Sequence, residues 1–284
     1  MIINSSRSIE RARALEELQY ILKIKSKVLV VHYSCESFLN LRNRVPRITS
    51  IAIHNLESGQ THSFSIYLSA QMKDLDMDKL TETARDQLER DTLTEYYKFV
   101  QKHKSYKWVH WKMRDQVYGF EAINARYRIL NGKPVSIADN NKYDLPRIIE
   151  QLYTSHYEKA SEEGKLLSLT KRNKIALGNA IPGYQEAMAY EDNNHQLLWM
   201  SSQQKVKIIS ELLLLASNDK LKVAATLVNV HGFSSLKFLK RSSLWSLLVL
   251  ILGMVGKELL NVTIKSLSDH LSVGAFILSA LGLN

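Results

Sequence analysis

The 284-residue sequence contains one cysteine, Cys35, so no disulfide can form within the chain. This residue lies in an apolar stretch, which favours a small buried side chain over a nucleophile, and a lone thiol suits a reducing compartment. The nine histidines show no metal-ligand spacing with acidic residues or with the cysteine, and the sequence has no glycine-rich phosphate loop of the usual form. A disulfide-stapled fold, a zinc site of cysteine and histidine, and a P-loop enzyme are therefore not expected.

The amino-terminal segment has no apolar core of the kind found in secretory signal peptides. Its acidic side chains are also untypical of a transit peptide. We therefore expect a protein that is not exported and that resides in the cytoplasm.

Apolar runs long enough to cross a bilayer are missing as well. Residues 244–256 and 271–283 form two apolar runs of thirteen residues each, whereas a spanning helix needs about 20. Basic residues and a tryptophan near the first run are typical of a membrane-interface anchor: Lys237, Lys240, Arg241 and Trp245. The apolar runs and the flanking basic residues of this segment, residues 244–283, therefore predict one of two arrangements. Either they attach the protein to the inner face of a membrane, or they form a helical pair that packs on the domain or in a homo-oligomer.

The remaining composition is that of a folded protein with a basic surface. Hydrophobic residues make up 45% of the chain, which is enough for a substantial core. The formal charge of +10 and a pI of about 9.5 favour contact with polyanions such as nucleic acid, or with an anionic membrane surface.

The stretch KVLVVHYSCESF, residues 27–38, reads as a buried central strand because its Val/Leu run turns polar only at the end. Side chains two apart on a strand point to the same face, so Ser34 and Glu36 are expected to project together.

The other elements are predicted around this strand as an α/β domain. Residues 5–24 read as an amphipathic helix, and residues 48–54 and 61–68 as two further strands in an antiparallel start to the sheet. A long helix over 76–104, a strand over 106–111 and a helix over 115–130 follow, and residues 136–139 are a short strand or an extended link. Helices are predicted for residues 143–153, 166–172, 183–192 and 203–215. The predicted divisions are an amino-terminal helix (1–26), the α/β domain (27–200), a helical connector (201–240) and a hydrophobic helical tail (241–284).

The order of the predicted elements and four short motifs resemble those of the DnaQ-like, or DEDD, 3′-5′ exonucleases of the ribonuclease H-like superfamily. The segment VHYSCES resembles the Asp-x-Glu end of that family's first strand, with Glu36 matching the glutamate and Ser34 standing in the place of the aspartate. HWKMRD is similar to the family's second motif and marks Asp115. YDLPRII marks Asp144, and IPGYQEAMAY marks Glu186.

The resemblance implies a ribonuclease H-like mixed sheet and a site in which carboxylates hold two divalent metals, Mg²⁺ or Mn²⁺. Glu36, Asp115 and Glu186 would be the metal ligands, with Asp144 as a further catalytic candidate. The motifs are degenerate, because Ser34 replaces the bridging aspartate and Ile181 and Pro182 stand where the family has its histidine or tyrosine. If the site is not functional, no cofactor is expected.

Each acidic residue also has a structural interpretation. Asp115 and Asp144 are possible helix caps, Glu36 a partner for Arg114, and Glu186 a residue on a solvated helix face. The best candidates for contacts with nucleic acid are five basic residues and one aromatic residue: Arg42, Arg44, Arg47, Lys112, Arg114 and Trp111.

Three hypotheses for function follow and remain open at this point. The first is a protein that binds nucleic acid or a nucleotide through a degenerate exonuclease-like domain, with a role in bacterial defence or regulation. The second is an active two-metal 3′-5′ exonuclease, a hydrolase, in which Ser34 or water fills the missing ligand position. The third is a membrane-associated effector whose globular part senses a partner. The defence role rests on analogy of fold alone.

Overall fold

The computed structural model describes residues 6–37, 45–115, 117–226, 230, 249–259 and 261. The chain divides into two compact units, Met1–Val230 and His231–Asn284. The first unit holds the sheet and the labelled helices, and we describe it first.

A five-stranded mixed sheet forms the centre of the first unit, in the order β3-β2-β1-β4-β5. The strands are β1 (Val28–Cys35), β2 (Ile48–Asn55), β3 (Thr61–Ser65), β4 (Lys107–His110) and β5 (Lys142–Asp144). β1 pairs with β2 and β2 with β3 in antiparallel fashion, whereas β1 with β4 and β4 with β5 are parallel pairs. The predicted antiparallel start and the parallel strands that follow it are thus confirmed.

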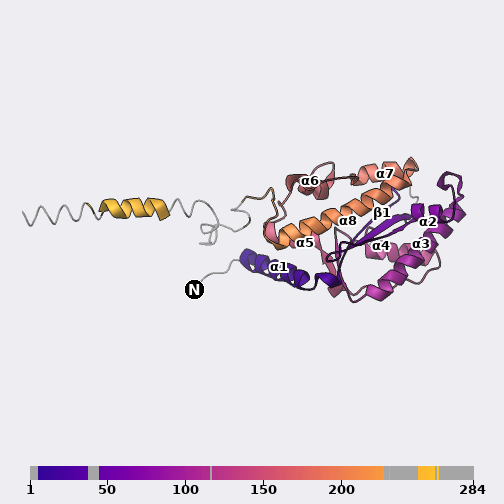
Figure 1. Cartoon of the computed structure of the whole chain (residues 1–284), viewed down its shortest axis with the longest axis horizontal. Helices are drawn as coiled ribbons and strands as arrows, with labels where there is room; N and C mark the ends of the chain where they lie inside the picture. The colour runs from indigo at the N-terminus through magenta and orange to yellow at the C-terminus, as the bar shows by residue number, and fades with distance from the viewer. Residues whose placement is uncertain are drawn as a thin grey trace, which may run out of the picture. The chain divides into compact units, whose positions relative to one another are not determined.

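Helices cover both faces of the sheet (Figure 1). They are α1 (Ser6–Lys23), α2 (Ile66–Met72), α3 (Glu82–His103), α4 (Phe120–Ile129), α5 (Leu145–Tyr153), α6 (Gly164–Arg172), α7 (Gly183–Glu191) and α8 (His195–Ser217). Short 3-10 turns occupy η1 (Lys25–Lys27), η2 (Met77–Lys79) and η3 (Asp139–Asn141).

Alternation along β1 divides the core into two layers. Val28 and Val30 pack with residues of α1, α5 and α8 on one face, whereas Leu29 and Val31 pack with α3 and α4 on the other. β1 is buried on both faces, as its Val/Leu run predicts. The even-numbered residues at its polar end therefore face α8, which runs along β1 and β2 (Figure 1).

Two predicted boundaries are wrong, each for a local reason. The strand predicted over 61–68 ends at Ser65, because the Ser65 hydroxyl accepts a hydrogen bond from the Tyr67 amide and caps α2. The helix predicted from Asp115 begins at Phe120, after a bridge between Arg114 and Gly119. Residues 136–138 form no strand, which agrees with the predicted alternative of a link, and the fifth strand of the sheet, β5, follows shortly after them.

The last labelled helix of the first unit, α8, is longer than predicted and packs against the sheet. It begins at His195, where the Asn194 side chain accepts from the Leu197 amide, and its Val206, Ile209 and Leu213 are fully buried. Much of the predicted connector therefore covers one face of the sheet.

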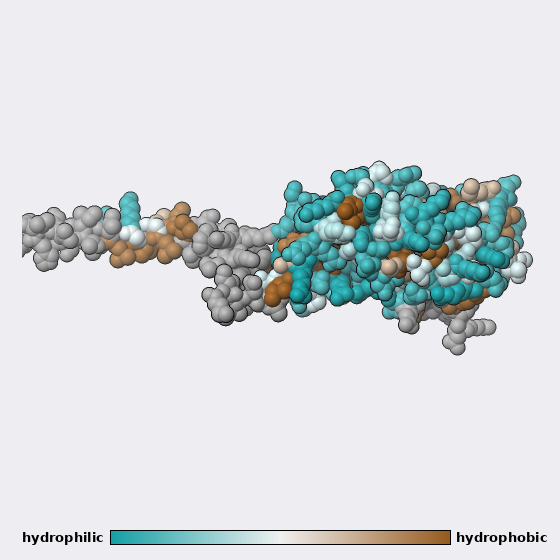
Figure 2. Space-filling view, turned by 90° about the horizontal axis from the view of Figure 1, so that it is seen from below, coloured by the Kyte–Doolittle hydropathy of each residue, from teal (hydrophilic) through white to brown (hydrophobic). Residues whose placement is uncertain are grey.

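The second unit is described only at residues 249–259 and 261, which are helical. Its large apolar side chains are at least half exposed, from 50% at Ile251 to 64% at Leu259, and Figure 2 shows a mostly hydrophobic surface on this helix. Within the part of the chain that the structure describes, no helix combines the length and the apolar character required to traverse a bilayer.

Candidate functional site

A cavity of about 360 Å³ opens at the carboxyl end of β1, between the loop after β4 and the helices α6, α7 and α8. In open α/β sheets this edge is the usual place for ligands. The cavity has an apolar wall and a polar wall. The apolar wall includes Trp111, Leu166, Leu167, Ile181 and Pro182. The polar wall includes His32, Ser34, Glu36, Glu163, Glu186 and Lys205.

Glu186, on α7, has three polar side chains around one of its carboxylate oxygens. Its Oε1 lies 2.7 Å from Nζ of Lys205 and accepts from the hydroxyl of Ser201 at 2.7 Å and from that of Ser34 at 3.2 Å. Ser34 also lies 2.8 Å from the hydroxyl of Ser202. Because Glu186 is only 8% exposed, its assignment to a solvated helix face is wrong. A buried carboxylate is instead neutralised by a buried ammonium.

Glu36 lies directly after β1 and lines the same cavity. The backbone amide of Arg47 donates to its carboxylate at 3.3 Å, and the Glu36 amide donates to the Arg47 carbonyl at 2.8 Å. A β-bulge between Ser34 and Cys35 shifts the register against β2 just before this point. The structure therefore brings Ser34, Glu36 and Glu186 to one cavity.

Asp115 and Asp144 lie on a different surface pocket, together with Lys112, Arg114 and Arg147. Asp144 pairs with Nε of Arg114 at 2.9 Å and accepts from the Lys112 amide at 3.1 Å. Burial raises the pKa of Asp144, and these donors and nearby cations act in the opposite direction. The four candidate acids are thus divided between two pockets.

Of the helix-cap interpretations of these two aspartates, that of Asp115 is wrong, and that of Asp144 is confirmed for its position. α4 begins at Phe120, so Asp115 does not cap it, and its carboxylate accepts from the Val117 amide instead. Asp144 occupies the cap position of α5, but its side chain makes no capping hydrogen bond there. Arg114 was one expected ion-pair partner of Glu36. In the structure it forms an ion pair with Asp144.

The donor set does not fit the two-metal centre that the resemblance implies. Among the described residues, no three His, Cys, Asp or Glu side chains approach closely enough to hold a metal ion together. The charge beside Glu186 is supplied by Lys205. Glu36, Asp115 and Glu186 as metal ligands therefore remain a prediction.

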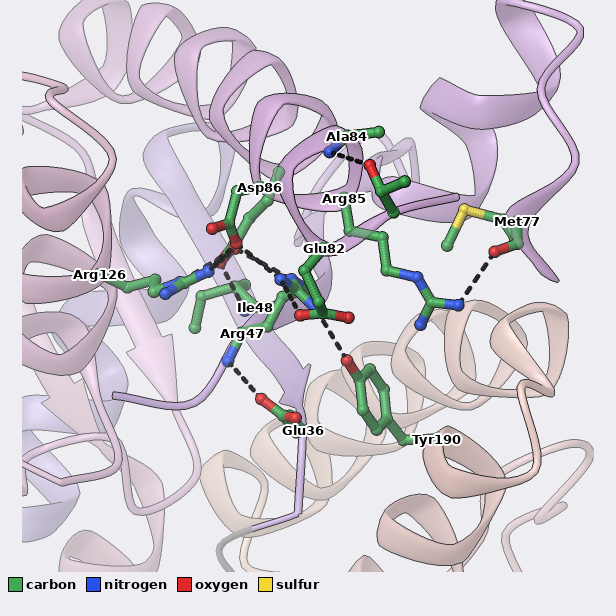
Figure 3. A network of polar contacts seen from close by, with 12 residues as sticks. Glu36, Arg47, Ile48, Met77, Glu82, Ala84, Arg85, Asp86, Arg126 and Tyr190 are labelled. Atoms are coloured by element: carbon green, nitrogen blue, oxygen red, sulfur yellow. Dashed lines mark hydrogen bonds and ion pairs between the residues drawn. The ribbon is translucent and has the colours of Figure 1, made fainter. Parts of the chain in front are cut away.

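The basic candidates differ widely in their surroundings. Arg42 and Arg44 lie outside the described residues. Arg47 is 2% exposed and forms ion pairs with Asp86 at 2.6 Å and Glu82 at 3.1 Å, as Figure 3 shows, so this arrangement does not favour it as a phosphate contact. Lys112 and Arg114 line the second pocket and are accessible there. Trp111 is mostly buried and lines the cavity.

The polar network around Arg47 connects the cavity to the far side of the sheet (Figure 3). The guanidinium of Arg47 also donates to the hydroxyl of Tyr190 on α7, 3.1 Å away. On α3, Glu89 is fully buried and accepts from the Ile48 amide at 2.8 Å and from Arg126 at 2.6 to 3.0 Å. One network therefore holds Arg47, whose backbone bonds Glu36 just before β2, and α7, which carries Glu186.

Burial and nearby charges keep two groups of the cavity uncharged at neutral pH, the Cys35 thiol and the His32 imidazole. Burial raises the pKa of the Cys35 thiol to about 12, and the carboxylates of Glu186 and Glu36 add to the shift, so this thiol is not a nucleophile at neutral pH. Burial also lowers the pKa of His32 well below its usual value, with Lys205 acting in the same direction. Both ring nitrogens of His32 lack a hydrogen-bond partner among the described residues.

The sequence analysis missed Lys205, which contributes the only cation of the polar wall described above. A signal was present, because Ser201, Ser202 and Lys205 share a helical face with apolar Leu198 and Ile209 in a segment rich in leucine and isoleucine. A lysine on a buried helix face requires an acidic partner. The pattern alone does not identify that partner as Glu186.

No protein-family model matches the sequence, and no curated protein matches it either.

Proposed function

We propose that the first unit is an exonuclease-like domain that binds nucleic acid or a nucleotide and does not cut it. The mixed sheet supports this proposal, because its antiparallel start and parallel second half have the arrangement that the resemblance implies. The position of the cavity at the carboxyl ends of parallel strands β1 and β4 also supports it.

The observation that carries the proposal is the buried pair of Lys205 and Glu186, which contacts the hydroxyl of Ser34. In a two-metal nuclease this region would present several carboxylates to divalent cations. Here a serine replaces one carboxylate, and an ammonium already neutralises another. A divalent cation would have to displace Lys205 from a site where both partners are buried.

A nuclease assay tests the absence of cutting. Purified protein is incubated with end-labelled DNA and RNA oligonucleotides in the presence of Mg²⁺ or Mn²⁺. We expect no stepwise shortening above that of a variant carrying Glu36→Gln and Asp115→Asn. Shortening by the natural chain that this double variant abolishes would contradict the proposal and favour the active exonuclease.

Binding is tested separately on the same oligonucleotides. The affinity should fall as salt rises, because binding of a basic protein to a polyanion releases counterions. Lys112→Gln should reduce the slope of log affinity against log salt, whereas Lys79→Gln, an exposed lysine on η2, serves as the matched control. The absence of binding at low salt would remove nucleic acid from the proposal.

A second candidate function, membrane association, is favoured by the helix at residues 249–259. Its exposed side chains include Val249, Leu250, Ile251, Leu252 and Val255, which follow one another around the helix rather than along one stripe. A helix that is apolar around its circumference requires an apolar environment. We expect the full chain to float with vesicles that contain phosphatidylglycerol, and a chain ending at residue 243 to remain unbound. If both chains remain unbound, this candidate is wrong.

A further inference from the structure

The three parallel strands begin at one edge of the sheet, opposite to the edge with the cavity. Val28, the first residue of β1, pairs with Lys107, the first residue of β4. Lys142, the first residue of β5, pairs with the next residue of β4. Neighbouring strands lie about 4.8 Å apart, so the residues just before the three strands lie within about 15 Å of one another. Five lysines define this amino edge: Lys23, Lys25, Lys27, Lys104 and Lys107.

Side-chain contacts hold the segments of the amino edge together. The Nζ of Lys107 donates to Oδ1 of Asn141 in η3 at 2.7 Å and lies 5.7 Å from the centre of the Tyr20 ring on α1. The side-chain amide of Asn141 donates to the carbonyl of Lys104 at 3.1 Å. The end of α1, the turn before β4 and η3 therefore meet at this edge.

Positive charge exceeds negative charge at the amino edge. The lysines that form ion pairs among the described residues are all outside the set of five: Lys73, Lys79, Lys98, Lys142, Lys171 and Lys205. Two acids lie nearby. Asp139 pairs with Lys142 at 2.9 Å, and Glu57 follows Leu56, whose amide donates to the carbonyl of Val28. These two acids do not balance the five lysines.

The second pocket has no such excess. Its charged lining consists of three cations and three acids: Lys112, Arg114, Arg147, Asp115, Asp144 and Glu150. The lysines of the amino edge, by contrast, repel one another, and a bound polyanion would relieve this repulsion. Of these two surfaces, the amino edge therefore attracts a polyanion more strongly.

A structural role explains part of this lysine content. Cations at the carboxyl end of a helix are stabilised by the helix dipole. Lys23 lies in the last turn of α1, and Lys104 directly follows α3. The dipole does not explain Lys107, a half-buried residue within β4 whose ammonium contacts an amide and aromatic rings.

The side chains between the lysines indicate the kind of polyanion. Ser26, Ser105 and Asn140 are exposed at this edge. Hydroxyl and amide side chains accompany lysine in contacts with the phosphates and sugars of nucleic acids. A surface that enters a membrane interface instead presents an apolar face.

We propose that the amino edge binds the phosphate backbone of a nucleic acid through Lys25, Lys27 and Lys104. This inference rests on the proposed function and deepens it, because it names the surface that supplies most of the contacts with phosphate. It places these contacts at the opposite edge of the sheet from the cavity.

Binding of labelled DNA and RNA oligonucleotides to the full chain over a range of salt concentrations tests the inference. Each lysine that contacts a phosphate contributes about 0.7–0.9 to the slope of log affinity against log salt. A triple variant carrying Lys25→Gln, Lys27→Gln and Lys104→Gln should therefore reduce the magnitude of this slope by about 2. Its affinity at about 0.1 M salt should fall at least about tenfold.

The matched control loses the same charge elsewhere on the first unit. It carries Lys79→Gln, Lys159→Gln and Lys174→Gln, three exposed lysines outside the amino edge, and its slope should stay within about 0.5 of that of the natural chain. A third variant replaces the three amino-edge lysines by arginine and should bind as tightly as the natural chain. Thermal unfolding checks that each variant keeps the fold.

Equal losses of affinity in the two glutamine variants would overturn the inference, because they would show an effect of net charge alone. A loss in the arginine variant would also overturn it, since the positive charge is kept there. Vesicles that contain phosphatidylglycerol are tested in parallel, and the amino-edge glutamine variant should float as the natural chain does. Loss of flotation with unchanged oligonucleotide binding would assign the amino edge to a membrane surface instead.

Failure of this inference is distinct from failure of the proposed function. If oligonucleotides bind with the expected salt dependence and the amino-edge glutamine variant binds as well as the natural chain, the domain still binds nucleic acid and only the surface is wrong. If the natural chain binds no oligonucleotide at low salt, both proposals are wrong.

Discussion

Replacing Glu89 by glutamine removes one negative charge from the buried network around Arg47 and Arg126 with almost no change in shape. Glu89 is fully buried and contacts Arg126 and the Ile48 amide, and Nε of Arg47 lies 3.5 Å from its carboxylate. The substitution leaves two buried guanidinium groups with less negative charge than they require. Removing one partner of a buried ion pair costs about 3–5 kcal/mol.

The lower end of that range is expected for Glu89→Gln, about 3 kcal/mol, for two reasons. Glutamine retains a carbonyl oxygen that can accept from the Ile48 amide. Burial also raises the pKa of Glu89, so desolvation outweighs the attraction to Arg126 and Arg47, and the loss comes mainly from hydrogen bonds of Arg126 that the glutamine amide nitrogen cannot accept. For a unit of this size, a loss of about 3 kcal/mol lowers the melting temperature by about 6–12 °C.

The matched control is Glu82→Gln. Glu82 also pairs with Arg47, at 3.1 Å, but its side chain is 73% exposed, and exposed ion pairs contribute at most about 1 kcal/mol. Thermal and urea unfolding followed by circular dichroism measure both variants. Equal small effects of the two substitutions would refute the structural role given to the network.

Two further predictions concern buried groups. Burial lowers the pKa of the His110 imidazole from 6.5 to about 3. As the pH drops below about 6.5, the unfolded chain binds a proton at this residue that the folded chain does not bind, so the free energy of unfolding decreases. His110 should account for about 2 kcal/mol of the stability lost between pH 6.5 and 4.5. The variant His110→Asn should therefore lose less stability over this pH range in urea unfolding, whereas His156→Asn, at an exposed position, should lose as much as the natural chain. Gly119→Ala should destabilise the chain by about 1–3 kcal/mol in the same assay, because an added Cβ would lie 2.5 Å from the Met113 carbonyl oxygen. Gly183→Ala, with open space at that position, should change stability little, and comparable losses for the two alanine variants would contradict this steric argument.

The positions of most elements could be predicted from local patterns. The Val/Leu run of β1 and the periodic apolar residues of α1, α5 and α6 carry the signals of strand and helix within their own sequence. Elements without such signals were missed or misplaced. β5 has only three residues, and α2 continues directly from β3 because Ser65 caps it.

The candidate site was predicted only in part. Ser34 and Glu36 are close in sequence, and the two-residue spacing at the end of a buried strand was sufficient to expect them together. The contacts of Ser34 with α7 and α8 join residues more than 150 positions apart, and no local pattern encodes such contacts.

The sequence by itself determined that this chain forms an α/β domain around β1, with a polar strand end and a separate apolar tail, because periodicity and burial preference are local properties. Tertiary structure alone decided that Glu186 meets Lys205, and that Asp115 and Asp144 line another pocket. The physical reason is that a buried charge depends on the partner that packing brings to it, and that partner is set by how helices cross the sheet.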